Sequence, residues 1–189
     1  MRNKEKYYLY LYSYCNVWSL ISRAIKFAQI WEGPYYSDFT HSEINFGAVK
    51  PWVKANYKIY KLLDKIKDYN LDSFLRYWIC YSSSIQDWSK TRFKHITNSN
   101  GNFHLNKIEV TRLEYINALQ YAIINTDKPY WYLWIFLYQI LKIERKITYW
   151  VFCSETVANV FKYIWILDFK TKSHLINPAK LKQYFDKRE

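Results

Sequence analysis

The order of strand-like and helical runs restricts the fold of this chain more than any other feature of its sequence. Alternating or tyrosine-rich runs, typical of strands, occupy 6–13, 40–46, 76–82, 92–96 and 103–110. Helical patterns interrupt them at 16–31 and 51–77, and they dominate after residue 110. Interleaved strands followed by helices predict an α+β domain.

Two helix starts after residue 110 carry capping signals. Thr111 is followed three residues later by Glu114, the pattern of a capping box. Asn177 precedes Pro178, which suits an N-cap with proline at the first helical position. Another helix begins at or near Cys153, and an apolar helical run covers 130–143. No repeat or low-complexity linker divides the chain, so we expect a single domain over residues 1–189.

Charge and composition limit the classes of partner. The formal net charge is +12, which favours an anionic surface such as nucleic acid or anionic lipid, although a merely solvated basic surface is an equal alternative. Three isolated glycines cannot build a glycine-rich nucleotide loop. The uncharged run 129–141 is thirteen residues long, too short to span a bilayer, and predicts a buried or interfacial helix.

The cysteines stand at Cys15, Cys80 and Cys153. An odd number without a C-x-x-C motif predicts neither a disulfide framework nor a zinc knuckle, and no histidine pattern indicates a metal. The N-terminus lacks the apolar core and cleavage site of a signal peptide. We therefore expect a reducing, cytoplasmic location.

Cys153 and His41 are the residues best placed for chemistry. A cysteine at a helix start lies near the positive end of the helix dipole, which favours the nucleophilic thiolate, although most free cysteines are simply buried apolar side chains. His41 shares a predicted strand face with Glu43 and could act as the base for such a cysteine. An exposed strand histidine is the alternative at this stage.

Several ordered segments resemble the permuted papain-like hydrolases of the NlpC superfamily, in particular the YaeF/YiiX, poxvirus and phage group. These segments are SLISRAIKFAQIWEGPYYSDFTH at 19–41, THSEINFG at 40–47, CYSSSIQDWSKTRFKHI at 80–96, DKPYWYLWIF at 127–136, VFCSETVANVF at 151–161 and HLINPAKLKQYF at 174–185. The chain departs from the family pattern at Trp131, usually acidic, and at Trp134, often glycine. Trp88-Ser89 also replaces a glycine-containing turn.

The resemblance implies a permuted papain-like fold, with a small antiparallel sheet or partial barrel against helices and a helical insertion at 48–76. It also implies a viral or phage origin and a cysteine hydrolase that needs no cofactor. Cys153 would be the nucleophile and His41 the base. Glu43 is the favoured third residue, with the region from Ser82 to Asp87 as the alternative, because residues two apart on a strand lie about 7 Å apart.

Substrates implied by the resemblance are peptides, isopeptide-like amides or lipid acyl groups. The backbone N–H of Cys153, with Tyr35 or Tyr36, would hold the oxyanion. A lipid acyl substrate would be favoured if one flank of the helix at 130–141 were open beside Cys153. Two other functions stay open at the level of sequence: a non-enzymatic nucleic-acid-binding protein rich in aromatic residues, and a degenerate hydrolase fold used as an interaction module.

Overall fold

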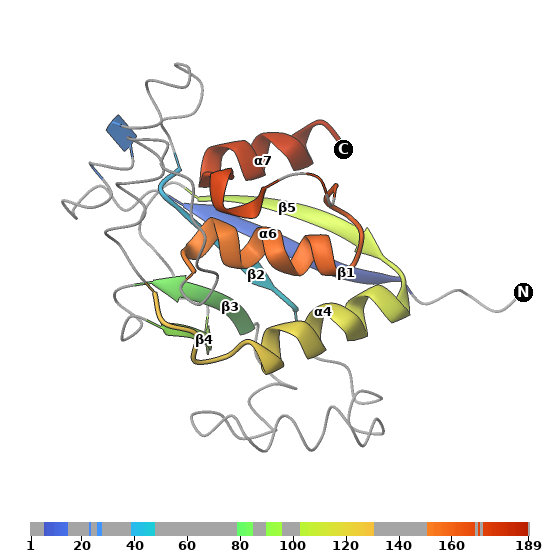
Figure 1. Ribbon diagram of the computed structural model, residues 1–189. Helices are drawn as coiled ribbons and strands as arrows, with labels where there is room; N and C mark the ends of the chain where they lie inside the picture. The colour runs from blue at the N-terminus through green and yellow to red at the C-terminus, as the bar shows by residue number, and fades with distance from the viewer. Residues whose placement is uncertain are drawn as a thin grey trace, which may run out of the picture.

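A five-stranded antiparallel sheet with helices packed on one face forms the centre of the protein (Figure 1). The computed structural model describes residues 6–14, 23, 26–27, 39–47, 79–84, 90–95, 103–130, 151–168, 170 and 172–188. The strands are β1 (Tyr7–Tyr14), β2 (His41–Asn45), β3 (Ile79–Ser84), β4 (Lys90–His95) and β5 (Phe103–Val110). The order across the sheet is β4-β3-β2-β1-β5. The expected α+β class is therefore confirmed.

The two faces of the sheet follow from the alternation of side chains along each strand. On β1, Leu9 and Leu11 point to the helices and are fully buried, and Ile44 of β2 lies beside Leu11. The tyrosines at even-numbered positions of β1, from Tyr8 to Tyr14, point to the opposite face. Tyr14 is paired with His41 and Tyr12 with Glu43, so the histidine and the carboxylate share that second face, as the alternation predicts.

The helices among the described residues are α4 (Arg112–Ile124), α6 (Cys153–Tyr163) and α7 (Pro178–Asp186), with a short 3₁₀ helix, η3 (Ser173–Leu175). In Figure 1, α6 crosses the sheet between α4 and α7, and it contacts β2 and β3. Their apolar residues complete the core; examples are Leu119, Val157, Phe161 and Phe185. None of the helices in the described ranges is both long enough and apolar enough to cross a membrane.

The predicted helix caps are present. The Thr111 hydroxyl accepts the backbone N–H of Glu114, and the Glu114 carboxylate accepts that of Thr111, which makes a complete capping box. The Asn177 side chain accepts the N–H of Lys180, with Pro178 at the first helical position. These caps satisfy donors that a helix start leaves unpaired, so local sequence alone fixes both boundaries.

Strand boundaries agree less closely with the sequence pattern. The strand expected at 76–82 contains β3, which extends two residues farther to Ser84, and the one expected at 92–96 begins two residues earlier, at Lys90. Both extensions have the same cause, since Ser83 pairs with Thr91 and Ser84 with Lys90. Residues 76–78 lie outside the described residues. Arg23, Lys26 and Phe27 are helical, as expected within 16–31. The expectations for 48–76, 51–77 and 131–143 lie outside the described residues.

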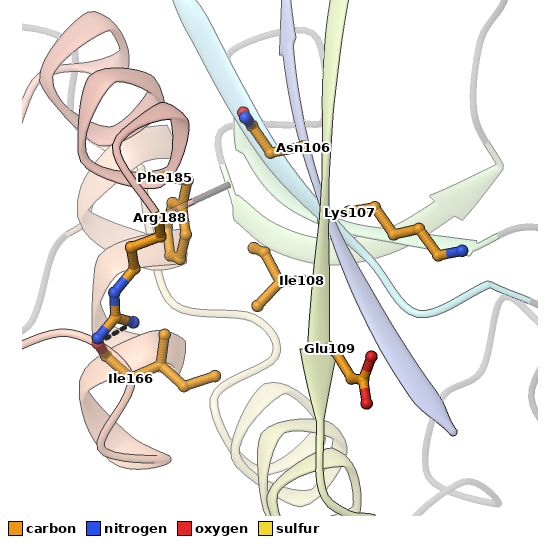
Figure 2. A pocket seen from close by; sticks show the side chains of 7 residues that line it. All are labelled: Asn106, Lys107, Ile108, Glu109, Ile166, Phe185 and Arg188. Carbon is orange, nitrogen blue, oxygen red and sulfur yellow. Dashed lines mark hydrogen bonds between the residues drawn. The ribbon is translucent and has the colours of Figure 1, made fainter. Parts of the chain in front are cut away.

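The two edges of the sheet differ. Along β4, backbone hydrogen bonds join Thr91 to Lys128 and to Asp127, at 2.8 and 2.9 Å, and Pro129 in turn accepts the N–H of Val151 at 3.1 Å. Within the described part of the chain, β5 pairs with β1 alone. Figure 2 shows side chains of β5 alternating, with Asn106 and Ile108 on the side of α7.

Candidate active site

Cys153 is the first residue of α6 and lies against the sheet. Phe152 is the N-cap, in an extended conformation, and contributes no side-chain capping bond. Cys153 is buried, and its sulfur accepts hydrogen bonds from the backbone N–H groups of Ser42 and Ser154. The helix start thus supplies one donor, the N–H of Ser154, as the sequence position predicted, and β2 supplies the other, the N–H of Ser42.

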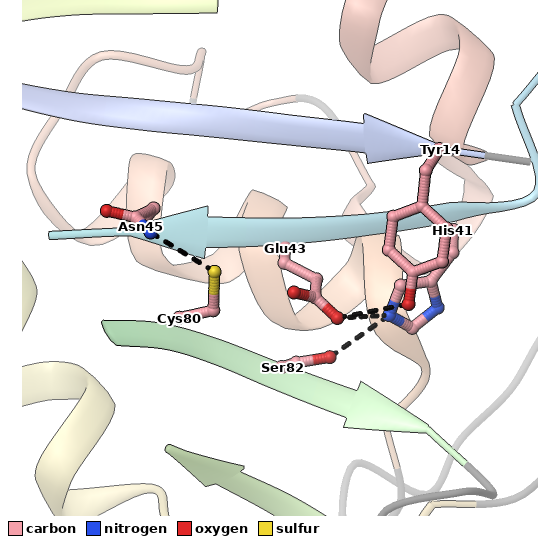
Figure 3. Close-up of polar contacts among 6 residues, drawn as sticks. All are labelled: Tyr14, His41, Glu43, Asn45, Cys80 and Ser82. Atoms are coloured by element: carbon pink, nitrogen blue, oxygen red, sulfur yellow. Dashed lines mark hydrogen bonds and ion pairs between the residues drawn. The ribbon is translucent and has the colours of Figure 1, made fainter. Parts of the chain in front are cut away.

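A local separation of two strands makes room for this sulfur. β2 and β3 are paired at Ile44 with Tyr81 and at Asn45 with Cys80, and their pairing in the described strands stops there. In Figure 3, the two strands diverge toward the end of β2 that carries His41. The backbone N–H of Ser42 in this gap therefore reaches Cys153.

Small hydroxyl side chains let α6 approach the sheet at this point. Ser13 and Ser42 are neighbours on the helix-facing side of β1 and β2, and both are fully buried. Ser83 is also buried and donates to the backbone carbonyl of Val151 at 3.5 Å, just before the helix begins. Larger side chains here would hold the helix start away from Ser42, because cores are close-packed.

His41 occupies the first position of β2 and has polar contacts on both sides of its ring. Its Nε2 atom lies 3.1 Å from Oε1 of Glu43 and 3.0 Å from Oγ of Ser82. A further hydrogen bond joins the imidazole to Cys153. Since Nε2 faces Glu43 and Ser82, Nδ1 is the atom left for the sulfur, and Figure 3 shows that nitrogen pointing away from both.

Glu43 is closer to His41 than the strand spacing suggested. The expected separation of about 7 Å applies to backbone positions, whereas Oε1 and Nε2 are 3.1 Å apart because the two side chains lean together beside the gap. The carboxylate is 1% exposed. It also accepts a hydrogen bond from the Tyr14 hydroxyl at 3.2 Å.

The structure brings both sequence alternatives for a third residue to the same nitrogen. Ser82 and Glu43 face Nε2 of His41 together, whereas Gln86 and Asp87 lie outside the described residues. A carboxylate is the stronger acceptor for an imidazolium N–H. Of the two contacts at Nε2, Glu43 therefore stabilises the positive charge of the ring, and Ser82 adds a neutral contact.

The electrostatics of the site favour a thiolate–imidazolium pair. Burial disfavours a charged His41, but the thiolate of Cys153 and the carboxylate of Glu43 outweigh this and raise the pKa of His41 to about 9. Burial likewise disfavours a charged Cys153. The adjacent imidazolium and the N–H groups of Ser42 and Ser154 outweigh that effect and lower the thiol pKa. Each member of the pair therefore stabilises the charged form of the other.

Two tyrosines at the site were missed by sequence reasoning. The ring of Tyr14 lies 4.8 Å from that of His41, between centroids, while its hydroxyl holds Glu43. Tyr130 is bridged to Val151 and is buried, and both its burial and the negative charge of Cys153 raise its pKa, which keeps its O–H protonated. The expected oxyanion donors, Tyr35 and Tyr36, lie outside the described residues.

A signal for Tyr14 was present in the sequence, since it continues the alternation of tyrosines just after the strand predicted at 6–13. Tyr130 lies within the segment at 127–136, in which the sequence analysis identified only Trp131 and Trp134 as departures from the family pattern. Of the remaining cysteines, Cys80 is buried and accepts a hydrogen bond from Asn45 at 3.3 Å, and Cys15 lies outside the described residues. Glu155 lies in the first turn of α6.

Among the residues that the structure describes, no three histidine, cysteine, aspartate or glutamate side chains gather as metal ligands would. The site itself consists of a buried cysteine, a histidine and a carboxylate in series. No protein-family model, no curated protein and no solved structure matches this chain.

Proposed function

We propose that the protein is a thiol hydrolase or acyltransferase of permuted papain-like fold, acting on an amide or ester carbonyl. One observation carries this proposal: His41 lies between a carboxylate and a thiol, with Nε2 bonded to Glu43 and the ring also bonded to Cys153. A base that is oriented by a third group and bonded to a nucleophile is the arrangement that covalent catalysis requires.

The reaction begins with the proton of Cys153 already on His41. The thiolate attacks the carbonyl carbon and forms a C–S bond, while the carbonyl π electrons move to the oxygen. The neutral Tyr130 hydroxyl and the N–H groups at the start of α6 are candidate donors to that oxyanion among the described residues. Collapse of the tetrahedral intermediate breaks the bond to the amine or alcohol, which leaves with the proton from His41.

The same histidine then acts as a base in the release of the acyl group from Cys153. Neutral His41 removes a proton from water, or from an acceptor amine or alcohol, as its oxygen or nitrogen attacks the thioester. The C–S bond breaks and the thiolate returns to its pair with His41. Glu43 holds the ring in one orientation throughout and stabilises its positive charge, a role supported by its 3.1 Å contact.

Acylation by p-nitrophenyl acetate tests this proposal without knowledge of the natural substrate. Intact-mass and peptide mapping should find acetyl on Cys153, absent from Cys153→Ser and strongly reduced in His41→Ala. His104→Ala is the matched control, because His104 lies on β5 and pairs with Asp186 rather than with the thiol. Acetylation of Cys80 at a similar rate, or a Cys153 rate unaffected by His41→Ala, would refute the proposal and favour a non-enzymatic role for the fold.

A further inference from the structure

A second feature of the molecule is a cavity along the edge of β5, with which no described strand other than β1 pairs. A cavity of about 430 Å³ is lined by four consecutive strand residues, Asn106 to Glu109, together with Ile166, Phe185 and Arg188 (Figure 2). A strand that lines a cavity with residues from both of its faces presents its backbone edge to that cavity. The unpaired N–H and C=O groups of such an edge are a template for another strand.

Asn106 supplies an acceptor that no described residue uses. Its side chain is fully buried, and its NH₂ group donates to Oδ1 of Asp186 at 2.8 Å. Partial burial disfavours an ionised Asp186, but hydrogen bonds from Lys182 and Asn106 outweigh it and lower the carboxyl pKa. An ionised carboxylate only accepts, so the amide orientation is fixed. The remaining Asn106 Oδ1 has no partner among the described residues.

A buried carbonyl oxygen without a partner is costly, so the site suits a ligand that brings an N–H donor. Peptide backbone provides such donors at regular spacing along an edge strand. The opposite wall offers apolar contacts from Ile108, Ile166 and Phe185, which would take an apolar side chain of the same ligand.

Arg188 sets the charge that the ligand should carry. Its guanidinium donates to the carbonyl of Ile166 at 2.8 Å and stacks on the Tyr184 ring at 5.0 Å. These contacts hold the group at the rim but leave most of its five N–H donors unused. No carboxylate of the described residues pairs with it, whereas Glu109 is paired with Lys6.

We propose that this cavity binds an extended peptide that adds a strand to the outer edge of β5. Its backbone pairs with Asn106 to Glu109, an apolar side chain packs on Ile108 and Phe185, and a carboxylate binds Arg188. Four strand residues span about 13 Å, so a short segment of four or five residues fills the site. Main-chain bonds provide affinity in this mode, and side-chain pockets provide specificity.

The site is separate from the candidate active site. His41 is aligned through Tyr14 with Phe103, and the cavity begins three residues farther along β5 and two strands across the sheet. Strand geometry places the two sites roughly 14 to 22 Å apart. Peptide binding therefore does not depend on the chemistry proposed for Cys153, and either proposal can fail alone.

Fluorescence anisotropy with a labelled peptide, Thr-Val-Thr-Val-Asp with an amidated C-terminus, tests the proposal on the full chain. We expect saturable binding that weakens roughly tenfold when the aspartate is replaced by asparagine, the loss of one charge-assisted hydrogen bond. Arg188→Gln should weaken the aspartate peptide to the same extent and leave the asparagine peptide unchanged. Arg112→Gln, at an exposed arginine outside the cavity, is the matched control.

Two further peptides separate the origins of the signal. A peptide ending in alanine with a free carboxylate shows whether Arg188 takes a chain terminus as well as a side chain. Methylation of alternate backbone nitrogens should abolish binding, because it blocks strand pairing. Undiminished binding of every methylated peptide would overturn the proposal. Absence of binding by both carboxylate peptides would also overturn the proposal. This holds equally if sedimentation shows that the chain forms a dimer, in which a second copy could cover β5.

Discussion

The ion pair between Cys153 and His41 makes a quantitative prediction for thiol alkylation. Replacing His41 with alanine removes the imidazolium that lowers the thiol pKa and leaves Cys153 in a buried site. A thiol of ordinary pKa, about 8.5, is only about 0.3% ionised at pH 6. If the pair is the main source of thiolate, the reactive population at pH 6 should fall by up to about 300-fold.

The assay is the rate of carbamidomethylation of each cysteine by iodoacetamide between pH 5 and 10, read by peptide mass spectrometry. Wild-type Cys153 should react at pH 6 and keep a plateau through neutral pH. A second change should follow near pH 9, where His41 loses its proton. The His41→Ala variant should instead show a single rise at or above the ordinary thiol pKa.

Cys80 is the internal reference, because it is buried on β3. His104→Ala is the matched variant and should keep the wild-type profile. Equal rates at pH 6 for Cys153 and Cys80 would refute the reasoning, as would superimposable profiles for wild type and His41→Ala.

Three further predictions follow from the same structure. Glu43→Gln should shift the upper alkylation change from about 9 toward the ordinary histidine pKa, with a smaller shift for Ser82→Ala; equal shifts in the two variants would contradict the charged contact of Glu43 with the ring. The raised His41 pKa gives stability that is complete below pH 6.5 and lost toward pH 9, whereas the lowered Cys153 pKa gives stability that is present above the ordinary thiol pKa and lost on acidification. Between about pH 6.5 and 8.5 the folded pair holds one proton, on His41, and the unfolded chain also holds one, on Cys153. The free energy of unfolding in urea, relative to a Cys153→Ser/His41→Ala variant, should therefore not change with pH in this range. A slope near 1.4 kcal/mol per pH unit would contradict the ion pair. Leu119→Ala, at a fully buried position of α4, should cost about 2–5 kcal/mol in urea unfolding, while exposed Leu113→Ala should cost little, and similar losses would contradict the packing.

Local sequence determined the helix starts. Thr111 with Glu114, and Asn177 with Pro178, satisfy backbone donors through residues at most three positions away, so tertiary packing was not needed to locate them. The position of Cys153 at the start of α6 belongs to the same class, because the change from a strand-like to a helical pattern is local. Side-chain alternation likewise placed His41 and Glu43 on one face of β2.

Tertiary structure alone decided how those residues meet. The short contact between Glu43 and His41, and the arrival of Ser82 at the same nitrogen, depend on where β2 and β3 stop pairing. Periodicity does not encode such a separation, because it gives the face of a strand and not the path of its neighbour. Tyr14 donates to Glu43 across 29 positions of the chain. Tyr130 is brought near the start of α6 by its bridge to Val151, two residues before Cys153. Only the folded chain could therefore reveal either tyrosine.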